Sequence, residues 1–247
     1  MKVLTINNVS KSFYTKLGEL EVINNLNLEL YEGEIIAIVG PSGSGKSTIL
    51  NLISGLLKPN VGKIEVTGNL GYMFQHDQLF EWRNVWKNIL LGLEIKHQIT
   101  DDRKEEIKDM LKKYDLYDFI YNYPHELSGG MRQRIALIRT LALKPNILLL
   151  DEPFSALDYQ TRIKVSDDVY NVIRNEKLSA ILVTHDISEA IAMADRVIVL
   201  SKRPATLKGN HKIVMQDEKS ITPLLKRKDP NFRMYFDEIW SELNEEG

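Results

Sequence analysis

Gly40-Pro41-Ser42-Gly43-Ser44-Gly45-Lys46-Ser47-Thr48 is a glycine-rich stretch that matches the phosphate-loop pattern G-x-x-x-x-G-K-[ST]. It follows Glu34–Val39, a short apolar run typical of a strand buried on both faces. It leads into Thr48–Gly55, whose apolar residues have helical spacing. A Gly/Ser-rich turn without function is the alternative. The strand before the stretch and the helix after it favour a phosphate loop.

The residue types of this stretch suit a bound triphosphate with Mg²⁺. Glycines allow the backbone to curl so that successive N–H groups face an anion, and the following helix directs the positive end of its dipole to the same place. Lys46 is expected to neutralise the β- and γ-phosphates, and Ser47 to bind Mg²⁺. We therefore predict that all nine residues contact the nucleotide and that Ser47 is also a metal ligand.

Two carboxylates follow a second apolar run. Ile147–Leu150 is typical of a buried strand, and Asp151 and Glu152 come directly after it. Open α/β sheets bind ligands at the carboxyl ends of their strands. We predict that Asp151 lies in the Mg²⁺ shell and that Glu152 is the base that polarises the attacking water. Without the phosphate loop, an ordinary strand end before Pro153 would be at least as good an interpretation.

Gln75 and His185 are expected at the same edge of the sheet. His185 closes another apolar strand, so we predict a γ-phosphate contact for it. Asp186 and Glu189 are placed to cap the next helix. Gln75 follows the strand Gly71–Phe74 and is a candidate for a metal or water contact. The remaining four histidines have no comparable placement, and we expect ordinary surface or core roles for them.

Leu127-Ser128-Gly129-Gly130-Met131 predicts a second helix start able to bind an anion. Ser128 is a good N-cap, and it precedes two glycines. One nucleotide needs only one phosphate loop. The residues alone therefore leave open which anion Ser128, Gly129 and Gly130 contact.

The remaining pattern predicts an α/β fold. Lys2–Val9 and Leu20–Leu30 alternate with a period of two, as half-buried strands do. Strands alternate with helices near both ends of the chain, which implies a mainly parallel sheet with right-handed crossovers. Between them, helical patterns such as Arg103–Tyr117 dominate. We predict one domain, with a core from residues 1–75 and 145–247 and an inserted helical subdomain at 76–144.

Composition excludes several kinds of site. Lys and Arg total 32 against 34 Asp and Glu, and no basic run occurs, so nucleic acid is not predicted as a partner. The absence of cysteine excludes disulfides, thiolate metal sites and cysteine nucleophiles. No apolar run approaches the roughly 20 residues of a membrane span. Any work at a membrane would therefore depend on another protein that holds the chain there.

Taken in order, these segments resemble the ABC-type ATPases over most of the chain. Leu127–Met131 is similar to the family signature, Gln75 to the centre of its glutamine loop, Ser155-Ala156-Leu157-Asp158 to its D-loop and His185 to its switch histidine. The resemblance implies ATP as the ligand. It also implies a phosphate-loop NTPase (RecA-like) core with a mainly parallel sheet, an antiparallel β subdomain and an inserted α-helical subdomain.

Two further residues gain meaning from the resemblance. Phe13 matches the aromatic residue that stacks on adenine in this family, with Tyr14 a less suitable neighbour. Met131 stands where the family most often has Gln. Because Ser128 and the glycines are retained, we expect nucleotide binding all the same.

The resemblance also implies partners. Two copies would pair head to tail, each ATP lying between one subunit's phosphate loop and Ser128-Gly129-Gly130 of the other. A transmembrane permease would dock near Gln75 on the cytoplasmic face of the membrane, with an extracytoplasmic solute-binding protein in the same system. Phe80, Trp82 and Trp86 would line that docking cleft or fill the core of the helical subdomain. Trp82 and Trp86 share a face if this segment is helical.

Three segments are similar to those of importer ATPases of the nitrate, sulfonate and taurine group. They are Met131 in the signature, Phe80–Ile89 and Leu200-Ser201-Lys202-Arg203-Pro204. The expected function is thus the ATPase subunit of an importer for a solute of that kind, with export still open. An ABC-type ATPase acting on DNA or the ribosome is one alternative, but it would usually carry coiled coils or two nucleotide domains. A phosphate-loop kinase is another, and it would leave Leu127–Met131 and His185 without roles.

Overall fold

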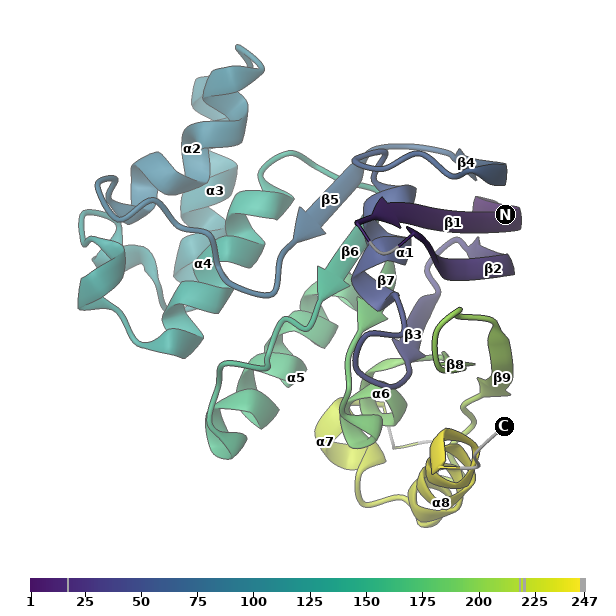
Figure 1. The fold of residues 1–247 in the computed structure, drawn as a ribbon. Helices are drawn as coiled ribbons and strands as arrows, with labels where there is room; N and C mark the ends of the chain where they lie inside the picture. Colours follow the sequence, from purple (N-terminus) through teal and green to yellow (C-terminus); the bar gives the residue numbers. More distant parts are fainter. Residues whose placement is uncertain (17, 218, 220, 245–247) are drawn as a thin grey trace.

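Six strands form the central sheet in the order β5-β6-β7-β3-β8-β9 (Figure 1). The structure is a computed structural model, and it describes residues 1–16, 18–217, 219 and 221–244. The neighbouring strands are parallel except for β8 and β9. The predicted, mainly parallel sheet is therefore confirmed. The strands are β3 (Ile35–Val39), β5 (Leu70–Met73), β6 (Ile147–Asp151), β7 (Ser179–Val183), β8 (Arg196–Leu200) and β9 (Leu207–Lys212).

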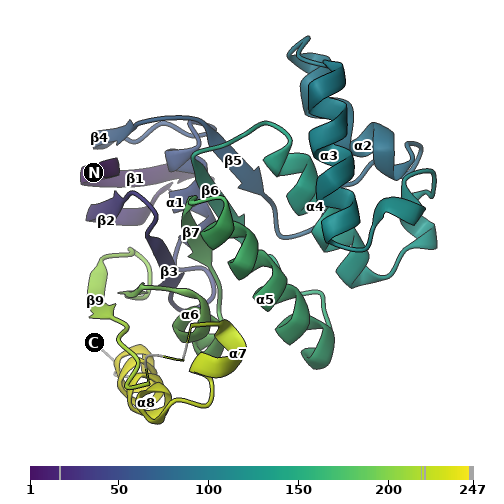
Figure 2. The ribbon, with the colours of Figure 1, turned by 180° about the vertical axis from the view of Figure 1, so that it is seen from behind.

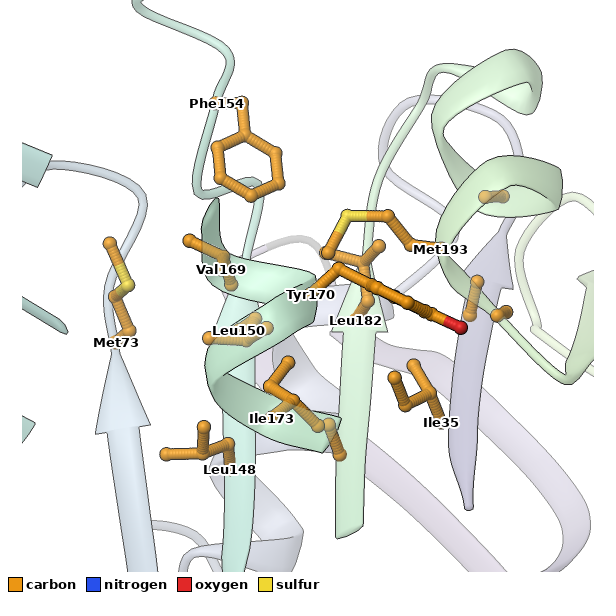
Figure 3. Close-up of a cluster of buried hydrophobic side chains, with 14 of the residues drawn as sticks. Ile35, Met73, Leu148, Leu150, Phe154, Val169, Tyr170, Ile173, Leu182 and Met193 are labelled. Carbon is orange, nitrogen blue, oxygen red and sulfur yellow. The ribbon is translucent and has the colours of Figure 1, made fainter. Parts of the chain in front are cut away.

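The central strands are buried on both faces, which explains their nearly continuous apolar sequences. In β3, Ile35 and Ala37 belong to one hydrophobic core, and Ile36 and Ile38 to another. The first core lies under the helices α5 (Tyr159–Asn175) and α6 (Ile187–Met193). Figure 3 shows this core, in which side chains of α5 lie over those of β6.

The second core joins the central sheet to an antiparallel sheet of order β2-β1-β4. Helix α1 (Lys46–Ile53) supplies Ile49 and Leu50 to this core. The antiparallel β subdomain is thus present, with longer hairpin strands than the alternation predicts. Its strands are β1 (Lys2–Thr15), β2 (Gly18–Tyr31) and β4 (Val61–Val66).

A group of helices stands to one side of the sheets (Figure 1). They are α2 (Val85–Ile95), α3 (Asp101–Lys113) and α4 (Gly129–Leu141), with short 3-10 helices at Tyr117–Phe119 and Pro124–Glu126. They share a third hydrophobic core. Ile135 and Ile138 of α4 belong to this third core, whereas Ala136 and Leu137 belong to the first core, between the central sheet and α5. Helix α4 therefore joins the helical group to the sheet, and Met110 of α3 packs against both cores as well.

The condition for a shared face of Trp82 and Trp86, a helix that covers both residues, is not met. Helix α2 begins only at Val85, where Asn84 accepts a hydrogen bond from the backbone N–H of Lys87. Trp82 lies in the turn before it, with 74% of its surface exposed, and its ring centroid is 4.7 Å from that of Phe80. Trp86 packs against the third core. Of the two alternatives, core filling therefore applies to Trp86. Trp82 does not fill the core, and its place in a docking cleft stays a prediction.

The C-terminal part of the chain covers the same face of the sheet as α5 and α6 (Figure 2). Helices α7 (Pro223–Lys226) and α8 (Pro230–Asn244) lie there. None of the described helices combines the length and apolarity needed to cross a membrane.

Candidate nucleotide-binding site

The phosphate loop joins β3 to α1 at the carboxyl edge of the central sheet. Gly43 and Gly45 have φ values of +75° and +102°, in the left-handed region that favours glycine. A Cβ on Gly45 would also lie 2.8 Å from Cγ1 of Val22. Gly45 is the N-cap of α1 and provides no side-chain hydrogen bond to it. The first N–H groups of the helix are thus left to bind an anion.

Lys46 lies over this loop. Its Nζ donates to the carbonyl oxygens of Gly40 and Pro41, at 2.9 and 3.0 Å, and the residue is only 7% exposed. Burial lowers the pKa of Lys46, while the charges of Glu152 and Asp151 act in the opposite direction. A phosphate at the loop would add further negative charge and so favour the protonated amine.

Ser47 and Asp151 form a site with hard oxygen ligands. The Ser47 hydroxyl donates to Oδ1 of Asp151 at 3.0 Å, and the Tyr72 hydroxyl donates to Oδ2 at 3.4 Å. Burial is the main cause that raises the pKa of Asp151, and the hydrogen bond from Ser47 opposes it. No cluster of three or more His, Asp or Glu side chains suited to a metal occurs in the described part of the chain. One carboxylate and one hydroxyl nevertheless fit Mg²⁺, which keeps several waters and takes phosphate oxygens as further ligands.

The side chains of Glu152, His185 and Gln75, all three predicted for the site, lie close together. Oε2 of Glu152 lies 3.1 Å from Nδ1 of His185 and 3.4 Å from Nε2 of Gln75. Glu152 has a φ of 44°, which is uncommon for a residue other than glycine. Its backbone N–H donates to the carbonyl oxygen of Val183 at 2.8 Å, so the turn is anchored to the neighbouring strand. The anchored turn directs the Glu152 carboxylate towards His185 and Gln75.

These residues line a cavity of about 730 Å³. Nine of the predicted site residues contribute to it: Ser42, Gly43, Gly45, Lys46, Ser47, Thr48, Gln75, Glu152 and His185. Val22 and Arg203 line it as well. The volume is within the range of small-molecule sites. One open cavity therefore connects the phosphate loop to the three side chains at the ends of β5, β6 and β7.

Other predicted residues lie outside this lining. Three residues of the phosphate loop, Gly40, Pro41 and Ser44, are not among the described residues that line the cavity. Asp151 lies behind Ser47. Phe13 is half-buried against the second core, with Nζ of Lys11 5.2 Å from its ring centroid. Its contact with adenine stays a prediction.

The segment Ser128-Gly129-Gly130 lies away from the cavity, at the start of α4. The Ser128 hydroxyl accepts a hydrogen bond from the backbone N–H of Met131 at 3.3 Å, so the predicted cap is confirmed. A Cβ on Gly130 would lie 2.8 Å from Cγ2 of Thr161. A larger residue at position 130 would therefore push α4 away from α5.

Asp186 caps α6 as predicted, by accepting a hydrogen bond from the backbone N–H of Glu189. The backbone N–H of Asp186 donates to the hydroxyl of Thr184 at 3.1 Å.

The chain that follows Gln75 is tied to α4. Arg139 donates to the carbonyl oxygens of Asp77 and Gln78 at 2.6 and 2.7 Å, and Nε of Arg132 donates to the Asp77 carboxylate at 2.8 Å. Burial alone would raise the pKa of Asp77, but hydrogen bonds, chiefly from Arg132, and nearby positive charge together lower it. Asp77 therefore stays ionised in this contact over the ordinary pH range.

Known proteins are similar to this chain in sequence and in fold. The ABC transporter family model matches residues 23–155. An ABC transporter ATP-binding protein of Bacillus subtilis is 39% identical, over 99% of this chain and 96% of its own length. The chain belongs to the ABC transporter ATP-binding family.

Other members of this family extend the comparison. The nitrate import ATP-binding protein of Synechocystis is 38% identical over 97% of this chain and 94% of its own length. The aliphatic sulfonates import ATP-binding protein of Bacillus cereus is 38% identical, over 85% of each chain. A solved dimeric ATP-binding cassette in a post-hydrolysis state, bound to ADP and Pi, has a TM-score of 0.75 and 30% identity, over 85% of this chain and 99% of that chain.

The ABC family membership confirms the predicted fold class and the binding and hydrolysis of ATP. The phosphate-loop kinase is therefore the wrong alternative. Sequence reasoning does not assign Val22 or Arg203 to the site, although both line the cavity. Val22 lies in a strand that reads as ordinary alternation, and Arg203 comes near the loop only because β8 is the neighbour of β3.

Proposed function

We propose that this ABC ATPase powers a solute importer, as a head-to-tail dimer bound to a permease on the cytoplasmic face of a membrane. The observation that carries the proposal is the single cavity in which Glu152, His185 and Gln75 face the phosphate loop. The nitrate and aliphatic sulfonate relatives are import proteins, and the dimeric cassette supports pairing. The solute would be nitrate, a sulfonate, taurine or a similar small molecule, delivered by an extracytoplasmic binding protein.

In this proposal the chain's own residues divide the work of hydrolysis. The loop N–H groups and Lys46 hold the phosphates in place. Glu152 accepts a hydrogen bond from the attacking water and polarises it, while His185 fixes the Glu152 carboxylate and faces the γ-phosphate. Ser47, Asp151 and Gln75 would hold Mg²⁺, which supplies neutralisation of the β- and γ-phosphate charge when bound.

The two anion sites of the chain then serve two different nucleotides. Ser128, Gly129 and Gly130 lie outside the chain's own cavity, so they are free to close the cavity of the partner. Phe13 would stack on adenine. Residues 76–144 would be the subdomain that meets the permease, with Trp82 exposed in the segment that follows Gln75.

A Glu152→Gln variant tests the assigned chemistry. It keeps the shape of the side chain but removes the carboxylate, so we expect ATP affinity to be retained and phosphate release to fall at least about 10²-fold. Titration calorimetry with ATP and a phosphate-release assay measure the two quantities. Glu176→Gln, which removes an exposed carboxylate outside the cavity, is the control. Phosphate release from Glu152→Gln at the wild-type rate would show that another residue is the base.

Import itself is tested with the copurifying membrane protein. We expect a permease to copurify and ATP-driven uptake to appear in vesicles that contain both proteins. Copurification with nucleic acid in place of a permease would instead support the DNA or ribosome alternative. ATP-driven efflux would reverse the proposed direction.

A further inference from the structure

Arg203 is a second basic residue at the nucleotide cavity. Among its described lining residues, Lys46 and Arg203 are the two that carry a lysine or arginine side chain. Arg203 is exposed and has no hydrogen bond or ion pair with any other described residue. A guanidinium that lines a cavity built for a polyanion is suited to bind phosphate oxygens in a fork-like geometry.

The order of the strands places Arg203 at a defined end of the cavity. The loop that carries it follows β8, which pairs with β3 on the side opposite to β7. A Cβ on Gly40 would lie 3.1 Å from Cβ of Leu200, so this loop begins directly beside the phosphate loop. Gln75, Glu152 and His185 follow strands on the other side of β3. Arg203 therefore lies at the end of the cavity away from the hydrolytic residues.

The loop around Arg203 is held in position from both sides. Two hydrogen bonds between Ser201 and Thr206 close the loop. The backbone N–H of Ser201 donates to the carbonyl oxygen of Thr206 at 3.1 Å, and the N–H of Thr206 donates to the Ser201 hydroxyl at 2.9 Å. After Arg203, the N–H of Ala205 donates to the carbonyl oxygen of Val22 at 2.8 Å. The position of Arg203 relative to Val22 is therefore set by the backbone, which limits the entropy lost when its side chain binds a ligand.

We infer that Arg203 binds the nucleotide at its α-phosphate and ribose end, as a binding residue separate from the γ-phosphate machinery. This inference rests on the proposed use of the cavity for ATP. Because ATP and ADP share that end, Arg203 contributes equally to both affinities. A residue acting on the γ-phosphate would instead favour ATP.

Arg203→Ala, Arg203→Lys and Lys202→Ala test this inference together. We expect Arg203→Ala to raise the Kd of ATP and of ADP by a similar factor, about tenfold, the loss typical of one charged hydrogen bond. The KM for ATP rises with it, and kcat stays within about twofold. Arg203→Lys recovers part of the affinity, because it keeps the charge and loses the fork. Lys202 lines a different, smaller cavity, so Lys202→Ala binds both nucleotides as the wild type does.

Three results would overturn the inference. They are unchanged affinities in Arg203→Ala, an equal loss in Lys202→Ala, and a fall of kcat without a change of KM. Lys46→Ala distinguishes a failure of this inference from a failure of the site. If Lys46→Ala loses nucleotide binding and Arg203→Ala keeps it, only the role of Arg203 is wrong. If both variants bind normally, the proposed cavity is not the nucleotide site.

Discussion

Glu189 is a carboxylic acid in the interior of the protein, and its burial makes stability depend on pH. It is 3% exposed, and Oε1 has no hydrogen-bond partner. Burial, with a smaller contribution from the charge of Asp186, raises its pKa from 4.5 to about 8, whereas Thr184, Arg162 and Arg227 oppose the shift. Between these two values the folded protein holds a proton that the unfolded chain releases. The stabilisation is complete below pH 4.5 and is lost as the pH rises through about 8.

The size of this loss follows from the shift. Each pH unit in the window contributes up to about 1.4 kcal/mol, so the whole window contributes on the order of 4 kcal/mol. Glu189→Gln stays neutral and should lose this dependence. We expect the two free energies of unfolding to be similar at pH 5 and the variant to be more stable than the wild type by several kcal/mol at pH 8.

Urea unfolding at pH 5, 6.5 and 8 gives the free energy of unfolding of the variant and of the wild type. The titrations of other groups cancel in the difference between the two free energies. Glu176→Gln, in which an exposed carboxylate is removed, should show a nearly constant difference from the wild type. A constant difference for Glu189→Gln as well would refute the reasoning, because it would mean that the buried carboxyl titrates normally.

Two further substitutions test the geometry of the site. Ser128→Arg in the Glu152→Gln background should abolish ATP-dependent dimerisation in light scattering. Ser128→Ala should dimerise and lose about 1 kcal/mol of stability with its cap; dimerisation of the arginine variant would contradict the shared site. Gly45→Ala should weaken ATP binding more than tenfold in calorimetry, since its Cβ meets Val22 at 2.8 Å in a left-handed conformation. Gly55→Ala is the control, because Gly55 has a similar φ but no atom within 4 Å of its added Cβ. It should lower the free energy of unfolding by about 1 kcal/mol and leave ATP affinity unchanged. Equal ATP affinities in the two variants would show that the contact with Val22 is unimportant.

Much of the fold follows from the sequence because buried parallel strands leave a strong signal. Strands β3, β6 and β7 are buried at every position, and each stands out as an apolar run. Edge strand β9 leaves no such signal. Its segment, Leu207-Lys208-Gly209-Asn210-His211-Lys212, is mostly exposed and is held by pairing with β8. Its strand conformation thus comes from tertiary contacts.

The site was predictable where a motif fixes the backbone. The phosphate loop and the strand ends place Lys46, Glu152 and His185, and the structure brings them to one cavity. The position of Arg203 required knowledge of the strand order, since β8 and β3 are more than a hundred residues apart in the chain. The contact of Glu152 with His185 depends on the positive φ at Glu152, which no local pattern indicates. The division into a core and a subdomain at 76–144 stays a prediction.

The contacts of Arg132 and Arg139 with the chain after Gln75 have a consequence for how two active sites communicate. Helix α4 is about 20 Å long, begins at the glycines proposed to face the partner's nucleotide, and holds the Gln75 segment through these arginines. These contacts reach Asp77 and Gln78, just after Gln75, so we expect a rotation of α4 to move Gln75 in the chain's own cavity. In the proposed dimer, filling one site displaces a residue of the other, so ATP occupancy should be cooperative, with a Hill coefficient above one.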